Sequence, residues 1–283
     1  MMRLPVLLVV VLYRCPLESS GTLQSLLKAR AAGMVPEALW IFDNEPAPGN
    51  ETSPMLASLE ATYEPSATNR GICPGYERAR LAALHAGIEW LWLFDQDSDF
   101  DPAFMLGMGK AWEVLARDAA CWAILPRVFS EGSLVSPLAR AALPPAERDG
   151  YLPASADARA INSGMMLRRR FVDGLGGFDQ RFWLDGLDHW LCLSARSAGQ
   201  RTGVATAVLQ HALSVTATTG FVSVARYRSI LAAERLLFQE HYTSGERVHY
   251  LARLLYRCVK QPLRWKSFAY LSSNLAQLWR VWV

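Results

Sequence analysis

The fold is decided by the stretch Trp90-Leu91-Trp92-Leu93-Phe94-Asp95-Gln96-Asp97-Ser98 of this 283-residue chain. Its first five residues are apolar, which predicts a strand buried on both faces, as in a parallel sheet. Ligands of open α/β sheets bind outside the carboxyl ends of the strands, where Asp95 and Asp97 stand. Alternate residues of an extended chain point the same way, so these two carboxylates can be presented to one hard cation.

Strands and helices alternate on both sides of this stretch, which predicts a mostly parallel sheet flanked by helices. The predicted strands are Val6 to Tyr13, Ala38 to Phe42, Trp90 to Phe94, Cys121 to Leu125, Ile161 to Leu167 and Val204 to Leu209. The predicted helices are Thr22 to Ala32, Pro74 to about Gly87, Pro102 to about Arg117 and Leu187 to Ala198. Residues 130–158 are predicted to be loop. Beyond Val222 the chain is predicted to be helical, with breaks at residues 243–245 and at Pro262.

Charge and cysteine content exclude several classes of protein. The net charge of +3 is too small to indicate nucleic acid as the main partner. Five scattered cysteines without a CxxC pair predict neither a zinc site nor a disulfide framework, and favour a reducing compartment. The apolar run after Arg3 could be the core of a signal peptide. A buried first strand is the favoured interpretation, because no small-x-small cleavage site follows. We therefore expect a cytoplasmic protein.

Several short motifs follow one another along the chain in a characteristic order. They are Phe42-Asp43-Asn44, Asn69-Arg70-Gly71, Asp95-Gln96-Asp97-Ser98, Ile161-Asn162-Ser163-Gly164, Gly176-Gly177-Phe178-Asp179, Asp185-Gly186-Leu187-Asp188 and His211. As a set they resemble the inverting nucleotide-sugar glycosyltransferases of family 2, and most closely the rhamnosyltransferase-like branch. The resemblance implies a GT-A fold, a Rossmann-like and mostly parallel sheet flanked by helices, over residues 1–220. A helical, basic and aromatic appendage is expected over residues 221–283.

The resemblance also implies a site for the donor nucleotide. Asp43 would accept a hydrogen bond from the ring N–H of uracil or thymine, which suits an acceptor-only carboxylate. Asn69, Arg70 and Gly71 would form the loop beside the nucleotide, with Arg70 able to pair with phosphate. The turn Asn162, Ser163 and Gly164 would line the sugar pocket, where a glycine permits close approach. An alternative for Asp43 is a turn or capping residue, and for Arg70 an exposed loop arginine.

The implied metal site and catalytic base are acidic. Asp97 would bind Mg²⁺ or Mn²⁺ directly, with Asp95 facing the ribose or a metal-bound water and His211 completing the site. Asp188 aligns with the family's base, and Asp185, about one helical turn earlier, is the reserve candidate. Here the chain departs from the family's pattern, because Trp190 stands where a second acid is usual. Either aspartate would also suit helix capping.

The C-terminal region is basic and aromatic. Between residues 244 and 283 the only acidic residue is Glu246, against seven arginines and lysines. This composition is typical of helices that lie in the interface of an anionic membrane. The alternatives are packing on the catalytic domain or on a second subunit of a homo-oligomer.

The sequence therefore predicts transfer of a sugar from a dTDP- or UDP-sugar to a glycan or lipid-linked acceptor in cell-surface polysaccharide synthesis. Rhamnose is the expected sugar through the resemblance alone. A nucleotidyltransferase is an alternative. Such an enzyme should carry a Gly-rich basic loop after the first strand, and residues 14–21 match that pattern poorly. The non-enzymatic alternative is a transferase-like scaffold attached to a membrane.

Overall fold

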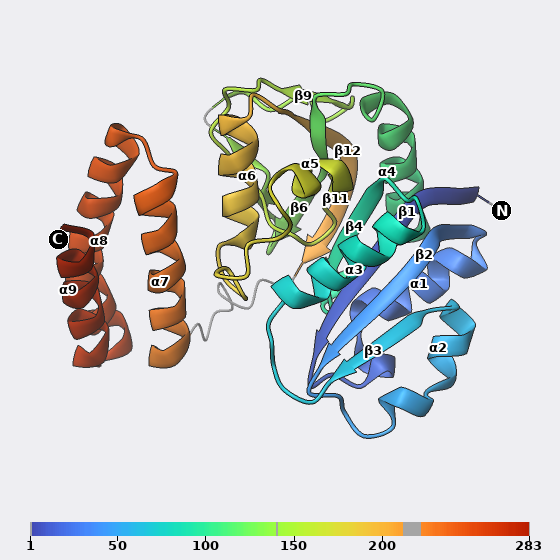
Figure 1. Ribbon diagram of the computed structural model, residues 1–283, viewed down its shortest axis with the longest axis horizontal. Helices are drawn as coiled ribbons and strands as arrows, with labels where there is room; N and C mark the ends of the chain where they lie inside the picture. Colours follow the sequence, from blue (N-terminus) through green and yellow to red (C-terminus); the bar gives the residue numbers. More distant parts are fainter. Residues whose placement is uncertain (1, 140, 212–221, 283) are drawn as a thin grey trace. The chain divides into compact units, whose positions relative to one another are not determined.

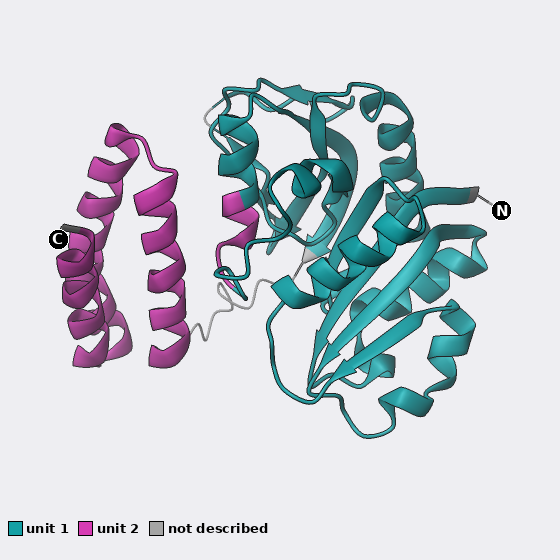
Figure 2. Cartoon of the chain, viewed as in Figure 1, with its two compact units in different colours: residues 1–184, 191–212 teal, residues 185–190, 213–283 magenta. Residues whose placement is uncertain are grey.

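The computed structural model describes residues 2–139, 141–211 and 222–282. Contacts divide the chain into two compact units (Figure 2). Unit 1 comprises residues 1–184 and 191–212, and unit 2 comprises residues 185–190 and 213–283. The predicted domain boundary at residues 220 and 221 lies outside the described residues. Among the helices that the structure describes, none has both the length and the apolar character that crossing a bilayer requires.

Unit 1 is built on a twisted sheet (Figure 1). Its strands follow the order β3 (Thr62–Ser66), β2 (Met34–Asn44), β1 (Met2–Tyr13), β4 (Trp90–Asp95), β11 (Met166–Arg168), β6 (Cys121–Ser130), β12 (Arg201–His211) and β5 (Ser98–Asp99). The pairs from β3 to β4 are parallel, as are β6 and β12, whereas β11 is antiparallel to both of its neighbours. Strands β1, β2, β4, β6 and β12 therefore share one direction and one carboxyl edge.

The predicted central strand, β1, owes its position to an unbroken apolar sequence. Residues 6–12 are all buried, which is the pattern of a strand covered on both faces. Alternate residues such as Leu8 and Val10 belong to the main core with helices α1 (Gly21–Ala31) and α4 (Pro102–Leu115). Helix α3 (Cys73–His85) also contacts β1 and β4, and it lies over the near face of the sheet in Figure 1.

Shorter elements complete unit 1. Helices α2 (Pro54–Leu59), α5 (Arg169–Gly174) and α6 (Leu187–Ser197) join the flanking layers, and α6 begins in residues assigned to unit 2. Strands β7 (Ser133–Ser136) and β9 (Gly150–Leu152) pair with β6 and β12, and β8 (Leu138–Ala139) pairs with β10 (Ala158–Arg159). The segment predicted as loop over residues 130–158 therefore contains short strands.

Two other sequence predictions are wrong. The predicted strand over residues 161–167 is reduced to Met166–Arg168, because Asn162, Ser163 and Gly164 turn instead and Gly164 has a φ of 82°. Pro262 does not break its helix but lies inside α8 (Ser244–Trp265), which ends at Lys266 in a left-handed conformation. The missing proline N–H costs one backbone bond, and the packing of α8 in unit 2 outweighs that cost.

Unit 2 is a group of helices with its own core, formed by α7 (Val224–Glu240), α8 and α9 (Phe268–Trp282). The buried side chains of this core are Tyr227, Leu231, Phe238, Tyr250, Leu254 and Tyr270. Thr243 and Glu246 form a capping box at the start of α8, with each side chain bonded to the other residue's backbone N–H. Glu234 of α7 accepts hydrogen bonds from Arg253 and Arg257 of α8, which fixes the two helices together.

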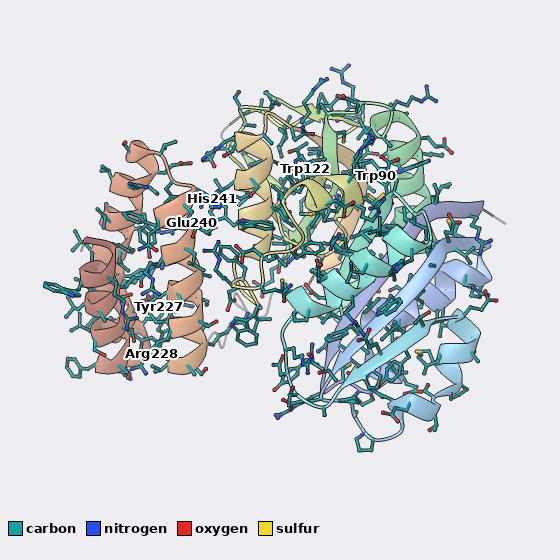
Figure 3. All side chains as sticks on the ribbon, viewed as in Figure 1. Trp90, Trp122, Tyr227, Arg228, Glu240 and His241 are labelled. Carbon is teal, nitrogen blue, oxygen red and sulfur yellow. The ribbon has the colours of Figure 1, made fainter. Side chains whose placement is uncertain are left out.

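One buried cation binds backbone carbonyl groups at the amino-terminal edge of the sheet in unit 1. The guanidinium of Arg168, at the end of β11, donates to the carbonyl oxygens of Cys121, Ala116 and Asp118 at 2.8, 2.7 and 3.1 Å. It also lies over the ring of Trp90, 4.6 Å from the centroid, and it pairs with Glu89. Trp90 and Trp122 are among the largest buried side chains (Figure 3).

We expect Arg168→Met to lower the free energy of unfolding by about 2–4 kcal/mol, because several buried carbonyl groups lose their donor. Arg170→Met is the matched control, since Arg170 pairs with the same Glu89 at 3.2 Å but is 55% exposed. Its effect should stay within about 0.5 kcal/mol. Urea denaturation measures both values, and equal losses in the two variants would contradict this account of Arg168.

Candidate functional site

The predicted carboxylates flank β1 at the carboxyl edge of the sheet. Asp43 of β2 is paired with Leu12, and Asp95 of β4 is paired with the preceding residue, Val11. The pKa of the Cys15 thiol, just beyond β1, is raised first by burial and then by the negative charges of Asp43 and Asp97. The three acids that the sequence placed at strand ends are therefore gathered around the end of β1.

The turn after β4 is held by the first turn of α1. The Thr22 hydroxyl donates to the backbone oxygen of Asp95 at 2.5 Å and accepts from the N–H of Ser98 at 3.1 Å. The backbone oxygen of Gln96 accepts from the hydroxyl of Ser20 at 2.8 Å. The side-chain oxygen of Gln96 accepts from the N–H of Tyr13. Asp97 is exposed at the tip of this turn. Because both sides of the turn are anchored, the position of the Asp97 backbone is fixed.

Asp95 is anchored at its side chain. Its Oδ2 atom accepts a hydrogen bond of 2.6 Å from the hydroxyl of Ser163, which is completely buried. The next residue, Gly164, donates its N–H to the carbonyl of Leu93 at 2.7 Å. A Cβ atom at Gly164 would lie 2.8 Å from the Pro126 side chain, so a larger residue is excluded. The turn Asn162, Ser163 and Gly164 thus packs directly on β4 and orients one of the two carboxylates.

His211 is the last residue of β12, and its backbone is paired with Ser98 of β5. This register brings the backbone of the predicted third metal ligand beside the residue that follows Asp97. The side chain of His211 lies outside the described residues. Among the side chains that are described, no group of three His, Cys, Asp or Glu residues stands in a metal-holding arrangement. The oxygen donors of Asp95 and Asp97 suit a hard cation such as Mg²⁺ or Mn²⁺.

Asp43 is completely buried, and its two oxygens differ. Its Oδ2 atom accepts hydrogen bonds from the amide of Asn50 and the hydroxyl of Tyr63, both at 2.7 Å. Its Oδ1 atom is buried, and no described group donates to it. Burial raises the pKa of the carboxyl, while the bonds from Tyr63 and Asn50 lower it. The carboxylate is therefore oriented by two donors at one oxygen, while its other oxygen has no donor among the described groups.

The loop Asn69, Arg70 and Gly71 lies next to the end of β2. Asn44 accepts from the N–H of Arg70 at 2.9 Å and donates to the carbonyl of Gly71 at 3.0 Å. Gly71 has a φ of 77°, and a Cβ atom there would lie 2.1 Å from the carbonyl oxygen of Trp183. Glycine is therefore required at this position. The side chain of Arg70 is exposed and lines a hollow of about 500 Å³ together with Glu64 and Arg78.

The two candidate bases belong to unit 2 and have different surroundings. Asp188 is half-buried in the first turn of α6, and its Oδ1 atom accepts from the N–H of His189 at 2.7 Å. Asp185 is ion-paired with Arg226 of α7 at 2.8 Å. The pKa of Asp185 is raised by burial, and Arg226 opposes that shift. Trp190, which stands where a second acid is usual, is buried. Asp185 is thus committed to an ion pair within unit 2.

Some residues of this region were not identified from the sequence. Asn50 and Tyr63 fix Asp43, and Thr22 and Ser20 fix the turn after β4. Asn50 sits in a Pro- and Gly-rich loop, and Tyr63 sits in an edge strand that the sequence did not indicate. Their only signal was a polar or hydroxyl group near a strand end or a helix start, which is too common to identify a site.

In sequence, the chain matches no protein-family model and no curated protein. In structure, it resembles several solved proteins, among them a mannosyltransferase. The mannosyltransferase PcManGT from Pyrobaculum calidifontis, solved in complex with GDP-Man and Mn²⁺, has a TM-score of 0.56 and 14% identity, over 99% of this chain and 75% of that chain. TarS from S. aureus has a TM-score of 0.53 and 10% identity, over 86% of this chain and 41% of that chain.

TarS 1-349 in complex with UDP has a TM-score of 0.53 and 11% identity, over 97% of this chain and 89% of that chain. The present chain thus matches only 41% of the longer TarS structure. These likenesses confirm the predicted fold class, an α/β glycosyltransferase-like sheet flanked by helices and followed by C-terminal helices.

We expect Arg226→Met to destabilise the protein by about 1–3 kcal/mol at pH 7, because a buried carboxylate loses its cationic partner. Removing Arg226 raises the pKa of Asp185 further, and a raised carboxyl pKa favours the neutral form in the fold. The stability that the fold gains from neutral Asp185 is present at acid pH, and it is lost as the pH rises through the folded-state pKa of this carboxyl group. The difference between variant and wild type should therefore shrink as the pH falls from 8 towards 4, because Asp185 becomes neutral in both folded proteins.

The control for this experiment is Arg228→Met, two residues along α7 (Figure 3). Arg228 is exposed and bonds only weakly to the hydroxyl of Ser273, at 3.3 Å. Thermal unfolding between pH 4 and pH 8 measures both variants. A loss in Arg226→Met that is equally large at both ends of the range would contradict the role given to Asp185.

Proposed function

We propose that the chain is a metal-dependent, inverting glycosyltransferase that uses a nucleotide-diphosphate sugar. The observation that carries the proposal is the grouping of Asp43, Asp95 and Asp97 at one end of β1, with one buried Asp43 oxygen lacking a described donor. The fold likeness to glycosyltransferases supports it. PcManGT was solved with GDP-Man and Mn²⁺, and TarS 1-349 with UDP, so this fold accommodates nucleotide-sugar chemistry in those proteins.

In this proposal, the chain's residues hold the donor in three ways. Asp43 accepts the ring N–H of uracil or thymine at Oδ1, with Asn50 and Tyr63 orienting the carboxylate through Oδ2. Asn69, Arg70 and Gly71 form the loop beside the nucleotide, and the exposed guanidinium of Arg70 pairs with a phosphate oxygen. Asn162, Ser163 and Gly164 line the sugar pocket, where the buried amide oxygen of Asn162 lacks a described donor.

Asp95, Asp97 and His211 would hold the metal ion, Mg²⁺ or Mn²⁺. When bound, the ion would neutralise the charge of the departing nucleoside diphosphate. Asp188 removes the proton of the acceptor hydroxyl as its oxygen attacks the anomeric carbon from the face opposite the leaving group. Asp188 lies in the first turn of α6. The ion pair of Asp185 with Arg226 supports Asp188 as the base.

The finer assignment rests on the sequence resemblance. Rhamnose from its dTDP ester is the proposed donor sugar, and a glycan or lipid-linked acceptor in cell-surface polysaccharide synthesis is the proposed partner. The proposed location is the cytoplasm. The alternatives are a nucleotidyltransferase and a non-catalytic, membrane-attached scaffold, and nucleotide binding distinguishes them from the proposed enzyme.

A thermal-shift experiment tests the proposal. We expect UDP or dTDP to raise the melting temperature in the presence of Mn²⁺ and much less in its absence, since ligand binding to the native state stabilises it. Asp97→Ala should abolish the metal-dependent part. Asp99→Ala is the matched control, because Asp99 is an exposed acid two residues further along, in β5, whose side chain accepts from the hydroxyl of Ser25 at 3.3 Å. A preference for a nucleoside triphosphate would favour the nucleotidyltransferase, and no response to any nucleotide would favour the scaffold.

The role of Asp43 gives a separate prediction. In Asp43→Asn, the amide oxygen can still accept from Asn50 and Tyr63, but an NH₂ group replaces the Oδ1 acceptor. A donor then faces the ring N–H of the base, so we expect the Kd for UDP to rise by about 10–100-fold. The free energy of unfolding should change by less than about 1 kcal/mol, since the bonds at Oδ2 persist.

Tyr63→Phe is the control for Asp43→Asn, because it removes one bond to Oδ2 and leaves Oδ1 unchanged. Its effect on the Kd should be several-fold smaller. Isothermal titration calorimetry with UDP and Mn²⁺ measures the binding of both variants. Unchanged UDP affinity in Asp43→Asn would remove the proposed contact with the base.

A further inference from the structure

Helix α8 carries an apolar stripe on the side that faces away from the core of unit 2. Val248, Leu255, Val259 and Leu263 follow one another at intervals of seven, four and four residues, which places them on one face of a helix. They are exposed by 68, 58, 65 and 73%. The opposite face of α8 is already occupied, since Tyr250 and Leu254 are buried in the core. The helix is therefore apolar on two sides, and only one of them is covered.

Helix α9 repeats this pattern with larger side chains. Phe268, Leu275 and Trp279 are separated by seven and four residues, and they are exposed by 83, 52 and 70%. Tyr270 and Asn274, on another face of α9, are buried. Exposed aromatic and aliphatic side chains that form a row on a helix are typical of a site of interaction with a protein or a membrane.

The segment that carries these stripes is cationic. Residues 244–283 contain seven basic residues and one acidic residue. Some of the cations serve the fold, since Arg257 pairs with Glu234 at 2.7 Å and Arg253 with the same carboxylate at 3.3 Å. Arg264 and Lys266, by contrast, take part in no ion pair within the described part of the chain. Lys260 lies 5.2 Å from the ring centroid of Tyr256, beside the α8 stripe.

A hollow of about 400 Å³ between α7 and α9 holds two more guanidinium groups. It is lined by Arg228 and Arg280 together with the hydroxyls of Ser272 and Ser273. Guanidinium and hydroxyl groups are the donors that phosphate head groups accept from. Arg280 directly follows Trp279, so a cation for a head group stands beside an aromatic side chain of the α9 stripe.

We propose that the exposed stripes of α8 and α9 bind the head-group region of an anionic lipid bilayer. The apolar side chains enter the interface between head groups and acyl chains, and Lys260, Arg264, Lys266 and Arg280 contact the phosphates. The second face of α8 is held by the core of unit 2, so this helix lies along the surface. Dimerisation of the chain through these stripes is less favourable, because two-fold pairing would bring the cations of both copies together.

Vesicle sedimentation with the full-length chain tests this proposal. We expect co-sedimentation with vesicles of phosphatidylglycerol and phosphatidylcholine, and little with phosphatidylcholine alone. Binding should weaken as salt is raised from 0.1 to 0.5 M, because salt screens the cations. No nucleotide or metal is added, so the result is independent of the proposed transferase activity. Absence of binding to the anionic vesicles at 0.1 M salt would overturn the proposal.

Two variants separate the apolar from the charged contribution. Leu255→Glu/Val259→Glu should abolish binding, whereas the control Val114→Glu should not, although Val114 of α4 is also 58% exposed. Lys260→Gln/Arg264→Gln/Lys266→Gln should weaken partitioning on the order of a hundredfold, since each cation near an anionic surface contributes about fivefold. Lys110→Gln/Arg148→Gln, from exposed positions of unit 1, should bind like the wild type.

Circular dichroism and sedimentation velocity complete the test. The stripe variants should keep the helical signal and the melting temperature of the wild type, so a loss of binding is not a loss of folding. If the wild type is a dimer that Leu255→Glu/Val259→Glu converts to a monomer, the stripe is a contact between copies and the proposal is wrong. Equal binding of the charge variant and the wild type to anionic vesicles would also overturn it.

Discussion

The hydroxyl of Thr22 is the contact on which the geometry of the site depends. It is completely buried, and it bonds to the backbone on both sides of the turn that carries Asp97. A helix start normally leaves N–H groups without partners. In α1, the N–H of Thr22 is instead bonded to the backbone of Gln96, at 3.3 Å. The first turn of α1 and the end of β4 therefore fix one another, and the carboxylates of Asp95 and Asp97 are presented from a rigid base.

Asp43 and Asp185 are two carboxyl groups whose burial is compensated in different ways. Burial raises the pKa of both carboxyl groups. Asp185 forms an ion pair with Arg226, so the negative charge of its carboxylate is balanced within unit 2. Within the described part of the chain, Asp43 gains only the neutral donors Asn50 and Tyr63, both at one oxygen. A buried carboxylate without a cation and with one unsatisfied oxygen is costly for folding alone. The two carboxyl groups therefore differ in how their burial is compensated.

Long, strongly patterned elements could be predicted from the sequence. β1, β4, α1, α3 and α4 begin and end within a few residues of their predicted bounds, because their apolar periodicity and caps act locally. The strand predicted over residues 161–167 failed because the N–H of Met165 donates to the carbonyl of Asn162, which closes a turn, and Gly164 has a positive φ. Pro262 failed as a helix end because tertiary packing outweighs propensity. The partners of Asp43 lie 7 and 20 residues away from it, and no local pattern indicates such contacts.

Strand β5 has only two residues, yet its pairing fixes the register of the end of β12 beside the turn that carries Asp97. In the observed register, His211 is opposite Ser98 and Gln210 is opposite Asp99. A slip of one residue would place Gln210 opposite Ser98 and would shift the end of β12 relative to the turn after β4. The alignment of β12 with that turn is thus set by two pairs of backbone partners at the sheet margin.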